Sequence, residues 1–99
     1  MRADWSRNEI EAVVDAYFWM LGEQIAGSDV SKKGVVKRLQ LTALSARNPS
    51  AISRKFSNVS AILNELRAPW VQSYKPLSHV QRALRDHVLV VMKTRGFPL

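Results

Sequence analysis

The chain contains no cysteine, and its four glycines are scattered at positions 22, 27, 34 and 96. The lack of cysteine excludes disulfides, thiolate catalysis and cysteine-based zinc sites. The scattered glycines form no glycine-rich phosphate loop, and no Gly-x-Ser-x-Gly motif occurs. We therefore expect a protein that is not an enzyme and has no cofactor.

Long hydrophobic runs are also missing. A run such as Val88–Met92 is far shorter than the roughly 20 residues that a membrane-spanning helix needs. The N-terminus reaches Asp4 without a basic segment followed by an apolar one, so it does not resemble a secretory signal. Together with the absence of cysteine, these features predict a cytoplasmic protein of bacterial type without a membrane partner.

Residues suited to metal binding or acid–base chemistry are few. The two histidines, His79 and His87, are eight residues apart. That is about two helical turns, too far for metal ligands on adjacent turns. Glu11 and Asp15 lie one turn apart in a predicted helix, a spacing that on an exposed face is typical of solvated side chains. The sequence therefore offers no candidate catalytic or metal-binding residue.

Acidic residues are absent between Asp29 and Glu65. Residues 1–30 carry two basic and six acidic side chains, a net charge of −4. Residues 31–99 carry thirteen basic and two acidic ones, a net charge of +11, which makes +7 for the chain. This polarity points to a negatively charged partner. Nucleic acid is the most common partner of this kind, and an acidic protein surface is the alternative.

Hydrophobic periodicity predicts four helices and no strand, so residues 1–99 should form a single all-α domain. The first helix should start at Ser6, which forms a capping box with Glu9, and should end at Gly27. The second should run from Ser31 to about Ser45.

The last two helices are bounded by proline and glycine. The third should begin at Pro49 after an Asn48 cap and end before Pro69, since proline restricts the residue that precedes it. An extended connection over residues 68–78 should be pinned to the core by its aromatic side chains. The fourth helix should start from a Ser78 cap and run to about residue 95.

The second and third predicted helices, joined by residues 46–48, form a helix-turn-helix candidate. The second helix of such a pair lies in the major groove, where Arg pairs with guanine, Asn with adenine and Ser with base or phosphate. We therefore predict DNA binding through the third helix, with duplex DNA favoured, although the sequence does not separate DNA from RNA. A single copy would contact few phosphates, so binding should be weak and salt-sensitive or involve a homodimer. The predicted base contacts are Ser50, Ser53, Arg54, Ser57 and Asn58, and the predicted phosphate contacts are Lys32, Lys33, Lys37, Arg38, Arg47 and Lys55.

A protein-interaction module is the alternative interpretation, because a basic face on a helical pair can also be simply solvated. Trp19 lies off the main hydrophobic stripe of the first helix and should be exposed, as interface tryptophans are. Val88–Met92 makes the fourth helix apolar on more than one side. An exposed apolar patch at either place would favour this alternative.

Three segments resemble a helical module found in many bacterial proteins. Residues 5–10 are Trp-Ser-Arg-Asn-Glu-Ile, residues 55–60 are Lys-Phe-Ser-Asn-Val-Ser, and residues 74–76 are Tyr-Lys-Pro. That module often lies N-terminal to restriction-type or HNH-type nuclease domains, so the resemblance implies a DNA-related accessory or recognition role. The chain departs from the module at Phe56, where the module usually has His, and at Ser73, where it usually has Gly.

Overall fold

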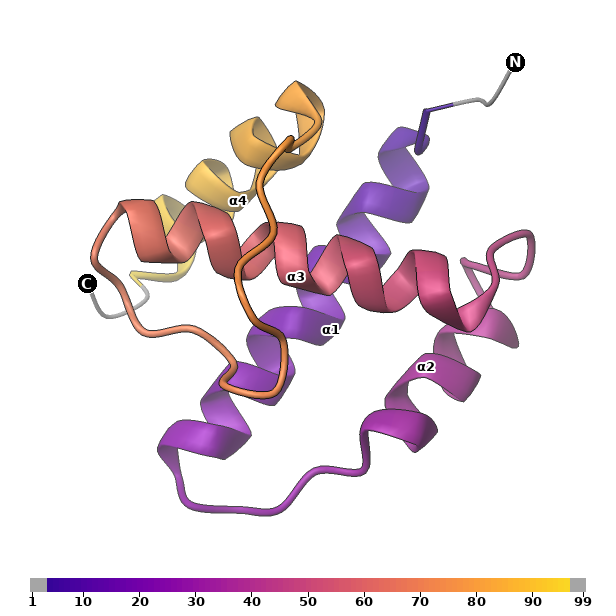
Figure 1. The fold of residues 1–99 in the computed structure, drawn as a ribbon, viewed down its shortest axis with the longest axis horizontal. Coiled ribbons are helices and arrows are strands. Elements are labelled where there is room, and N and C mark those ends of the chain that lie inside the picture. The colour runs from indigo at the N-terminus through magenta and orange to yellow at the C-terminus, as the bar shows by residue number, and fades with distance from the viewer. Residues whose placement is uncertain (1–3, 97–99) are drawn as a thin grey trace.

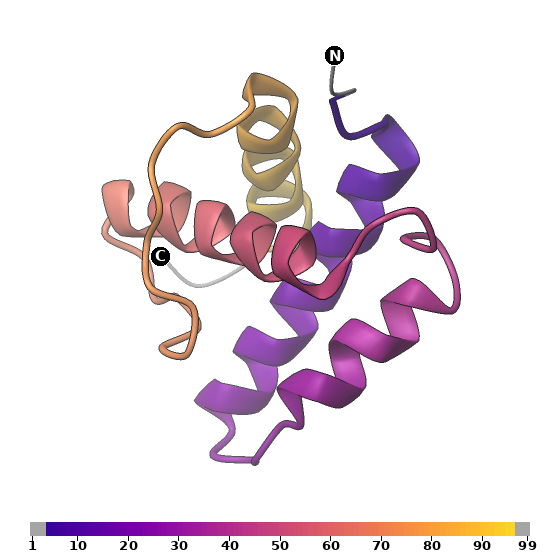
Figure 2. The ribbon, with the colours of Figure 1, turned by 45° about the vertical axis from the view of Figure 1, so that its right-hand side comes forward.

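The computed structural model describes residues 4–96, which form an all-α domain with no strand in that range. The four helices are α1 (Arg7–Ile25), α2 (Lys32–Gln40), α3 (Pro49–Glu65) and α4 (Arg82–Arg95). Helices α1 and α3 cross at the centre and pack against each other, and each also contacts both α2 and α4. Helices α2 and α4 do not touch, and they lie on opposite sides of α3 (Figures 1 and 2).

Side-chain caps fix the starts of three helices as predicted. Ser6 and Glu9 form a reciprocal capping box at α1, and Ser31 accepts a hydrogen bond from the Gly34 N–H at α2. Asn48 accepts one from the Ala51 N–H and places Pro49 in the first turn of α3. These caps satisfy backbone donors that the first helical turn leaves unpaired.

Two predicted boundaries are wrong. Helix α2 ends at Gln40, and the chain then turns so that Leu44, which is fully buried, donates its N–H to the Leu39 carbonyl. The link between α2 and α3 is therefore eight residues long, 41–48, instead of three. Ser78 caps no helix, because the chain stays extended along α3 and α4 begins only at Arg82.

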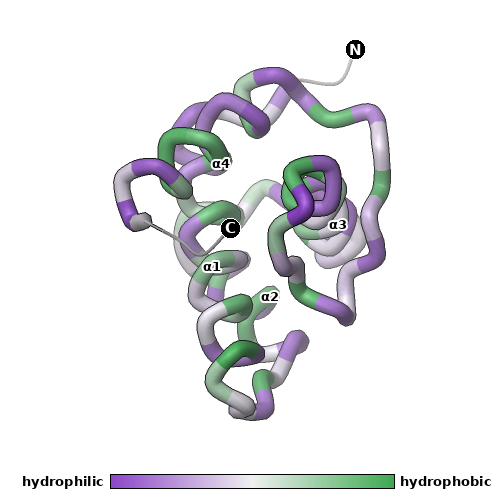
Figure 3. Tube along the Cα trace, turned by 90° about the vertical axis from the view of Figure 1, so that its left-hand side faces the viewer, coloured by the Kyte–Doolittle hydropathy of each residue, from purple (hydrophilic) through white to green (hydrophobic). Residues whose placement is uncertain are grey.

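The core contains residues from all four helices and from the connections formed by residues 41–48 and 66–81. Hydrophobic and hydrophilic residues alternate along the helices, as amphipathic packing requires (Figure 3). At the centre, the buried Tyr17 hydroxyl of α1 accepts a hydrogen bond from the Val71 N–H at 2.8 Å and shares another with the Ser60 hydroxyl at 2.7 Å. Burial raises the pKa of Tyr17 to about 12. One hydroxyl thus joins α1, α3 and the connection between α3 and α4.

The connection formed by residues 66–81, here called the crossing segment, passes over the outer face of α3 (Figure 1). The Leu77 N–H donates to the Ser57 carbonyl at 3.1 Å. The Asn58 side-chain amide donates to the Leu77 carbonyl at 2.6 Å. Tyr74 is 7% exposed and packs on Phe56 with 4.9 Å between ring centroids, so the predicted aromatic anchor of this segment is confirmed.

Candidate nucleic-acid interface

Two clefts flank the first turns of α3. The first, called the arginine cleft, lies between residues 4–5, α3 and residues 79–81 and has a volume of about 610 Å³. The second, called the lysine cleft, lies between α2, α3 and the crossing segment and has a volume of about 600 Å³. The arginine cleft is lined by Asp4, Trp5, Arg47, Ala51, Arg54, Lys55, Asn58, His79, Val80 and Gln81. The lysine cleft is lined by Lys32, Lys33, Val36, Lys37, Gln40, Pro49, Ser53 and Tyr74.

The lysine cleft gathers three of the predicted phosphate contacts. Lys32, Lys33 and Lys37 are exposed on α2, and the buried Val36 and Tyr74 form its apolar floor. The Lys32 ammonium lies 5.6 Å from the centre of the Tyr74 ring. Burial raises the pKa of Tyr74, against a hydrogen bond from Ser53 that lowers it, so the phenol stays neutral at neutral pH. The cleft therefore combines positive charge at its rim with an apolar base.

In the arginine cleft, two of the basic side chains, Arg47 and Lys55, already have partners within the protein. The Arg47 guanidinium donates to both oxygens of Glu9, and both side chains are largely buried, with exposed fractions of 17% and 14%. The hydrogen bond from Arg47 is the main reason that the pKa of Glu9 falls to about 2, and Glu9 in turn raises the pKa of Arg47. The pair joins the connection before α3 to the start of α1, so Arg47 has a structural role. Because Glu9 compensates its charge at close range, Arg47 is a poor phosphate contact, contrary to the prediction.

Lys55 and Trp5 belong to the same cluster. The Trp5 ring has the Arg47 guanidinium 4.7 Å and the Lys55 ammonium 4.9 Å from its centre, within the range of cation–π contacts. Lys55 also donates to the Gln81 side chain at 3.3 Å, and Gln81 donates to the Trp5 carbonyl. This cluster fastens Trp5 to α3 and to the start of α4.

Asn58 cannot present its amide to a base, which overturns its predicted role. It is 6% exposed, and its amide donates to the Leu77 carbonyl at 2.6 Å. Ser57 is half-buried, and its carbonyl accepts from Leu77. The crossing segment therefore covers the middle of the helix that was predicted to contact bases.

Over residues 50–58, where base contacts were predicted, the open part of α3 is its first two turns. Ser50 and Arg54 are exposed, Ser53 is half-buried, and Arg54 lines the arginine cleft. Arg38 is exposed on α2 but lines neither cleft. The structure thus brings Lys32, Lys33, Lys37, Ser53 and Arg54 to the flanks of one helix end, with Ser50 between them.

Sequence reasoning missed several residues that line the arginine cleft, above all His79 and Gln81. His79 has a positive φ of 66°, a left-handed backbone conformation that is uncommon for histidine. Nothing in the local sequence marks this conformation. Two residues earlier, the Leu77 N–H donates to the Ser57 carbonyl, a contact between distant parts of the chain that brings residues 79–81 to this cleft.

Comparison of the chain with protein-family models, with curated proteins and with solved structures gave no significant match. The resemblance to the bacterial helical module therefore stays a prediction from the sequence. Residues 4–96 contain no helix long and apolar enough to cross a membrane. The same residues contain no group of three or more His, Asp or Glu side chains placed to hold a metal ion.

Proposed function

We propose that this protein is a non-enzymatic nucleic-acid-binding module of the bacterial cytoplasm, with DNA as the favoured partner. The observation that carries the proposal is the pair of basic clefts on the two sides of the first turns of α3. Their exposed cations, Lys32, Lys33, Lys37 and Arg54, come from two helices and lie around one helix end. Among the residues that line the two clefts, Asp4 is the one with an acidic side chain.

The chemistry of this arrangement suits a polyanion better than a small substrate. Exposed lysine and arginine side chains bind phosphates and release counterions, so affinity should fall steeply with salt. The start of α3 adds a favourable field for anions, because its macrodipole is positive there. The net charge of +11 over residues 31–99 extends the same field beyond the clefts.

A salt titration with cleft variants tests the proposal. Fluorescence anisotropy of a labelled oligonucleotide at about 50 and 200 mM salt should show binding that weakens as salt rises. Lys33→Ala/Lys37→Ala and Arg54→Ala should bind more weakly than wild type. Arg82→Ala/Lys93→Ala, a control that removes two exposed cations outside the clefts, should bind nearly as wild type does. An absence of binding at low salt would rule the proposal out.

Binding to a protein is the second candidate, and exposed apolar side chains favour it. Trp19 on α1 is 56% exposed, and Leu89 and Val90 on α4 are 41% and 54% exposed. Val88, Val91 and Met92 are buried, so this surface of α4 is smaller than the sequence predicted. A homodimer through Leu89 and Val90 would appear as a concentration-dependent mass in sedimentation, and Val90→Ser would abolish it.

A further inference from the structure

The middle of α3 is not available to enter a DNA groove. An α-helix with its side chains is about 10–12 Å wide, and the major groove is about 12 Å wide. A helix that fills the groove has no room for a second chain along its outer side. Here the crossing segment lies on that side, held by the Leu77 N–H to the Ser57 carbonyl at 3.1 Å and by Asn58 to the Leu77 carbonyl at 2.6 Å.

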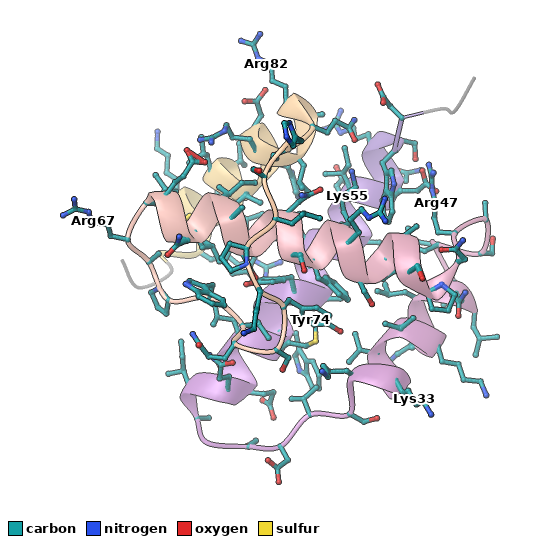
Figure 4. All side chains as sticks on the ribbon, in the orientation of Figure 1. Lys33, Arg47, Lys55, Arg67, Tyr74 and Arg82 are labelled. Carbon is teal, nitrogen blue, oxygen red and sulfur yellow. The ribbon has the colours of Figure 1, made fainter. Side chains whose placement is uncertain are left out.

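The exposed basic residues lie beside α3, at the rims of two concave surfaces. The arginine cleft opens on one side of the first turns of α3 and the lysine cleft on the other (Figure 4). In that view Lys55 and Arg47 lie above α3, while Lys33 and Tyr74 lie below it. A duplex is stiff, with a persistence length of about 150 bp, and does not bend into two hollows on opposite sides of one helix end. A flexible strand can do so.

We infer that the nucleic acid bound by this protein is a single strand, which passes over the first turns of α3 from the lysine cleft to the arginine cleft. This inference rests on the proposed function. Lys33 and Lys37 bind phosphates on one side of α3, and Arg54 binds a phosphate on the other. Ser50 lies between them, exposed in the first turn, where its hydroxyl can bond the backbone of the strand.

The two clefts also offer room for bases. Each has a volume of about 600 Å³, within the range of pockets that hold a small organic group. Each has an aromatic side chain in its wall, Trp5 in one and Tyr74 in the other, and both rings already have basic side chains over them, so the hollows offer space and charge to a base and not an open ring face. Unpaired bases can turn away from their neighbours and enter such hollows, whereas stacked and paired bases cannot. A positively charged groove that follows the backbone is one of the usual means of holding single strands without strong sequence preference.

The test compares one labelled oligodeoxynucleotide of about 15 nucleotides, a typical site size for single-strand binders, with its own annealed duplex. The whole protein is titrated into each at the two salt concentrations used above. The single strand should bind more tightly than the duplex. The slope of log affinity against log salt should fall by about 1.4 in Lys33→Ala/Lys37→Ala, as expected for two lost phosphate contacts on a single strand. It should not change in the Arg82→Ala/Lys93→Ala control.

The outcomes separate this inference from the proposed function. A duplex bound as tightly as the single strand, or more tightly, overturns the inference and leaves nucleic-acid binding in place. Single-strand binding that neither Lys33→Ala/Lys37→Ala nor Arg54→Ala weakens also overturns it, because the strand would then lie elsewhere. Failure of both forms to bind at low salt removes the proposed function and the inference together. Circular dichroism of each variant checks that a loss of binding is not caused by unfolding.

Discussion

The Arg47 guanidinium holds the Glu9 carboxylate through two hydrogen bonds of 2.8 and 2.7 Å, although the two residues lie 38 positions apart in the chain. Glu9 also completes the capping box of α1 by accepting from the Ser6 N–H. The same carboxylate therefore serves the start of one helix and fastens the connection before another to it.

This pair predicts a loss of stability in acid. The pKa of Glu9 is about 2 in the folded protein, against 4.5 for an ordinary glutamate. A lowered folded-state pKa stabilises the protein above pH 4.5, and that contribution disappears as pH falls towards 2. Glu9→Gln should lower the free energy of unfolding at pH 7 by about 1.5–3 kcal/mol, the usual worth of hydrogen bonds to charged groups. It should also flatten the pH dependence between about pH 5 and 2, measured by urea unfolding.

Glu11→Gln is the matched control for that experiment. Glu11 pairs with Arg7 one turn away, and their side chains are 44% and 90% exposed. Exposed pairs of this kind contribute about 0.3–0.5 kcal/mol. Equal losses in Glu9→Gln and Glu11→Gln at pH 7 would contradict the importance given to the Arg47 contact.

A second prediction concerns the buried Tyr17 hydroxyl. Tyr17→Phe leaves the Val71 N–H without its partner at 2.8 Å and the Ser60 hydroxyl without its partner at 2.7 Å. Each buried group left unpaired costs about 1–3 kcal/mol, so unfolding by urea should show a loss within or above that range. Ser60→Ala keeps the bond to Val71 and should cost less. A smaller loss for Tyr17→Phe than for Ser60→Ala would argue against the shared hydroxyl.

A third prediction separates the two interpretations of Asn58. If Asn58 holds the crossing segment on α3, Asn58→Ala should lower the free energy of unfolding by about 1–3 kcal/mol, because the Leu77 carbonyl loses its donor. Hydrogen exchange of residues 77–81 should accelerate, while the salt dependence of nucleic-acid binding should stay as in wild type. Ser50→Ala, at an exposed position of the same helix, should leave stability within about 0.5 kcal/mol. A stable Asn58→Ala with a reduced salt slope would restore the role first predicted from the sequence.

A fourth prediction compares Gly22, which lies within α1, with Gly27, which follows the end of that helix. Gly27 has a φ of 82°, whereas Gly22 lies within the helix, and an added Cβ would meet no atom within 4 Å at either position. Gly22→Ala should therefore stabilise the protein by about 0.5–1 kcal/mol through helix propensity. Gly27→Ala should destabilise it by about 1–2 kcal/mol, the cost of a left-handed alanine. Thermal unfolding of the two variants checks the opposite signs, and equal shifts would contradict the assigned end of α1.

Helix type and most helix ends could be predicted because the signals are local. Ser6 with Glu9, Asn48 with Pro49, and Gly27 each act within one turn of the residues they influence. The end of α2 could not be found this way, since Leu44 turns into the core from a connection that periodicity alone extends as helix. There, burial of one side chain outweighed local preference.

The candidate site was predicted only in part, for the same reason. Charge and composition identified Lys33, Lys37 and Arg54 as available cations, and these do lie exposed beside α3. They could not reveal that Arg47 has a carboxylate partner from α1, or that Leu77 covers Asn58. Both facts depend on contacts between distant parts of the chain, which sequence spacing does not encode.

The Tyr17 hydroxyl has a consequence for how the molecule opens. The Val71 N–H, which donates to this hydroxyl, belongs to a connection without helix, and such backbone groups usually exchange their hydrogens during small local fluctuations. Here its acceptor is fully buried and Val71 itself is 5% exposed, so solvent reaches this N–H only when the crossing segment detaches from the core. The amide of Val71 should therefore exchange far more slowly than the exposed amides of the same connection, which makes this loop residue a reporter of when the crossing segment leaves the two central helices.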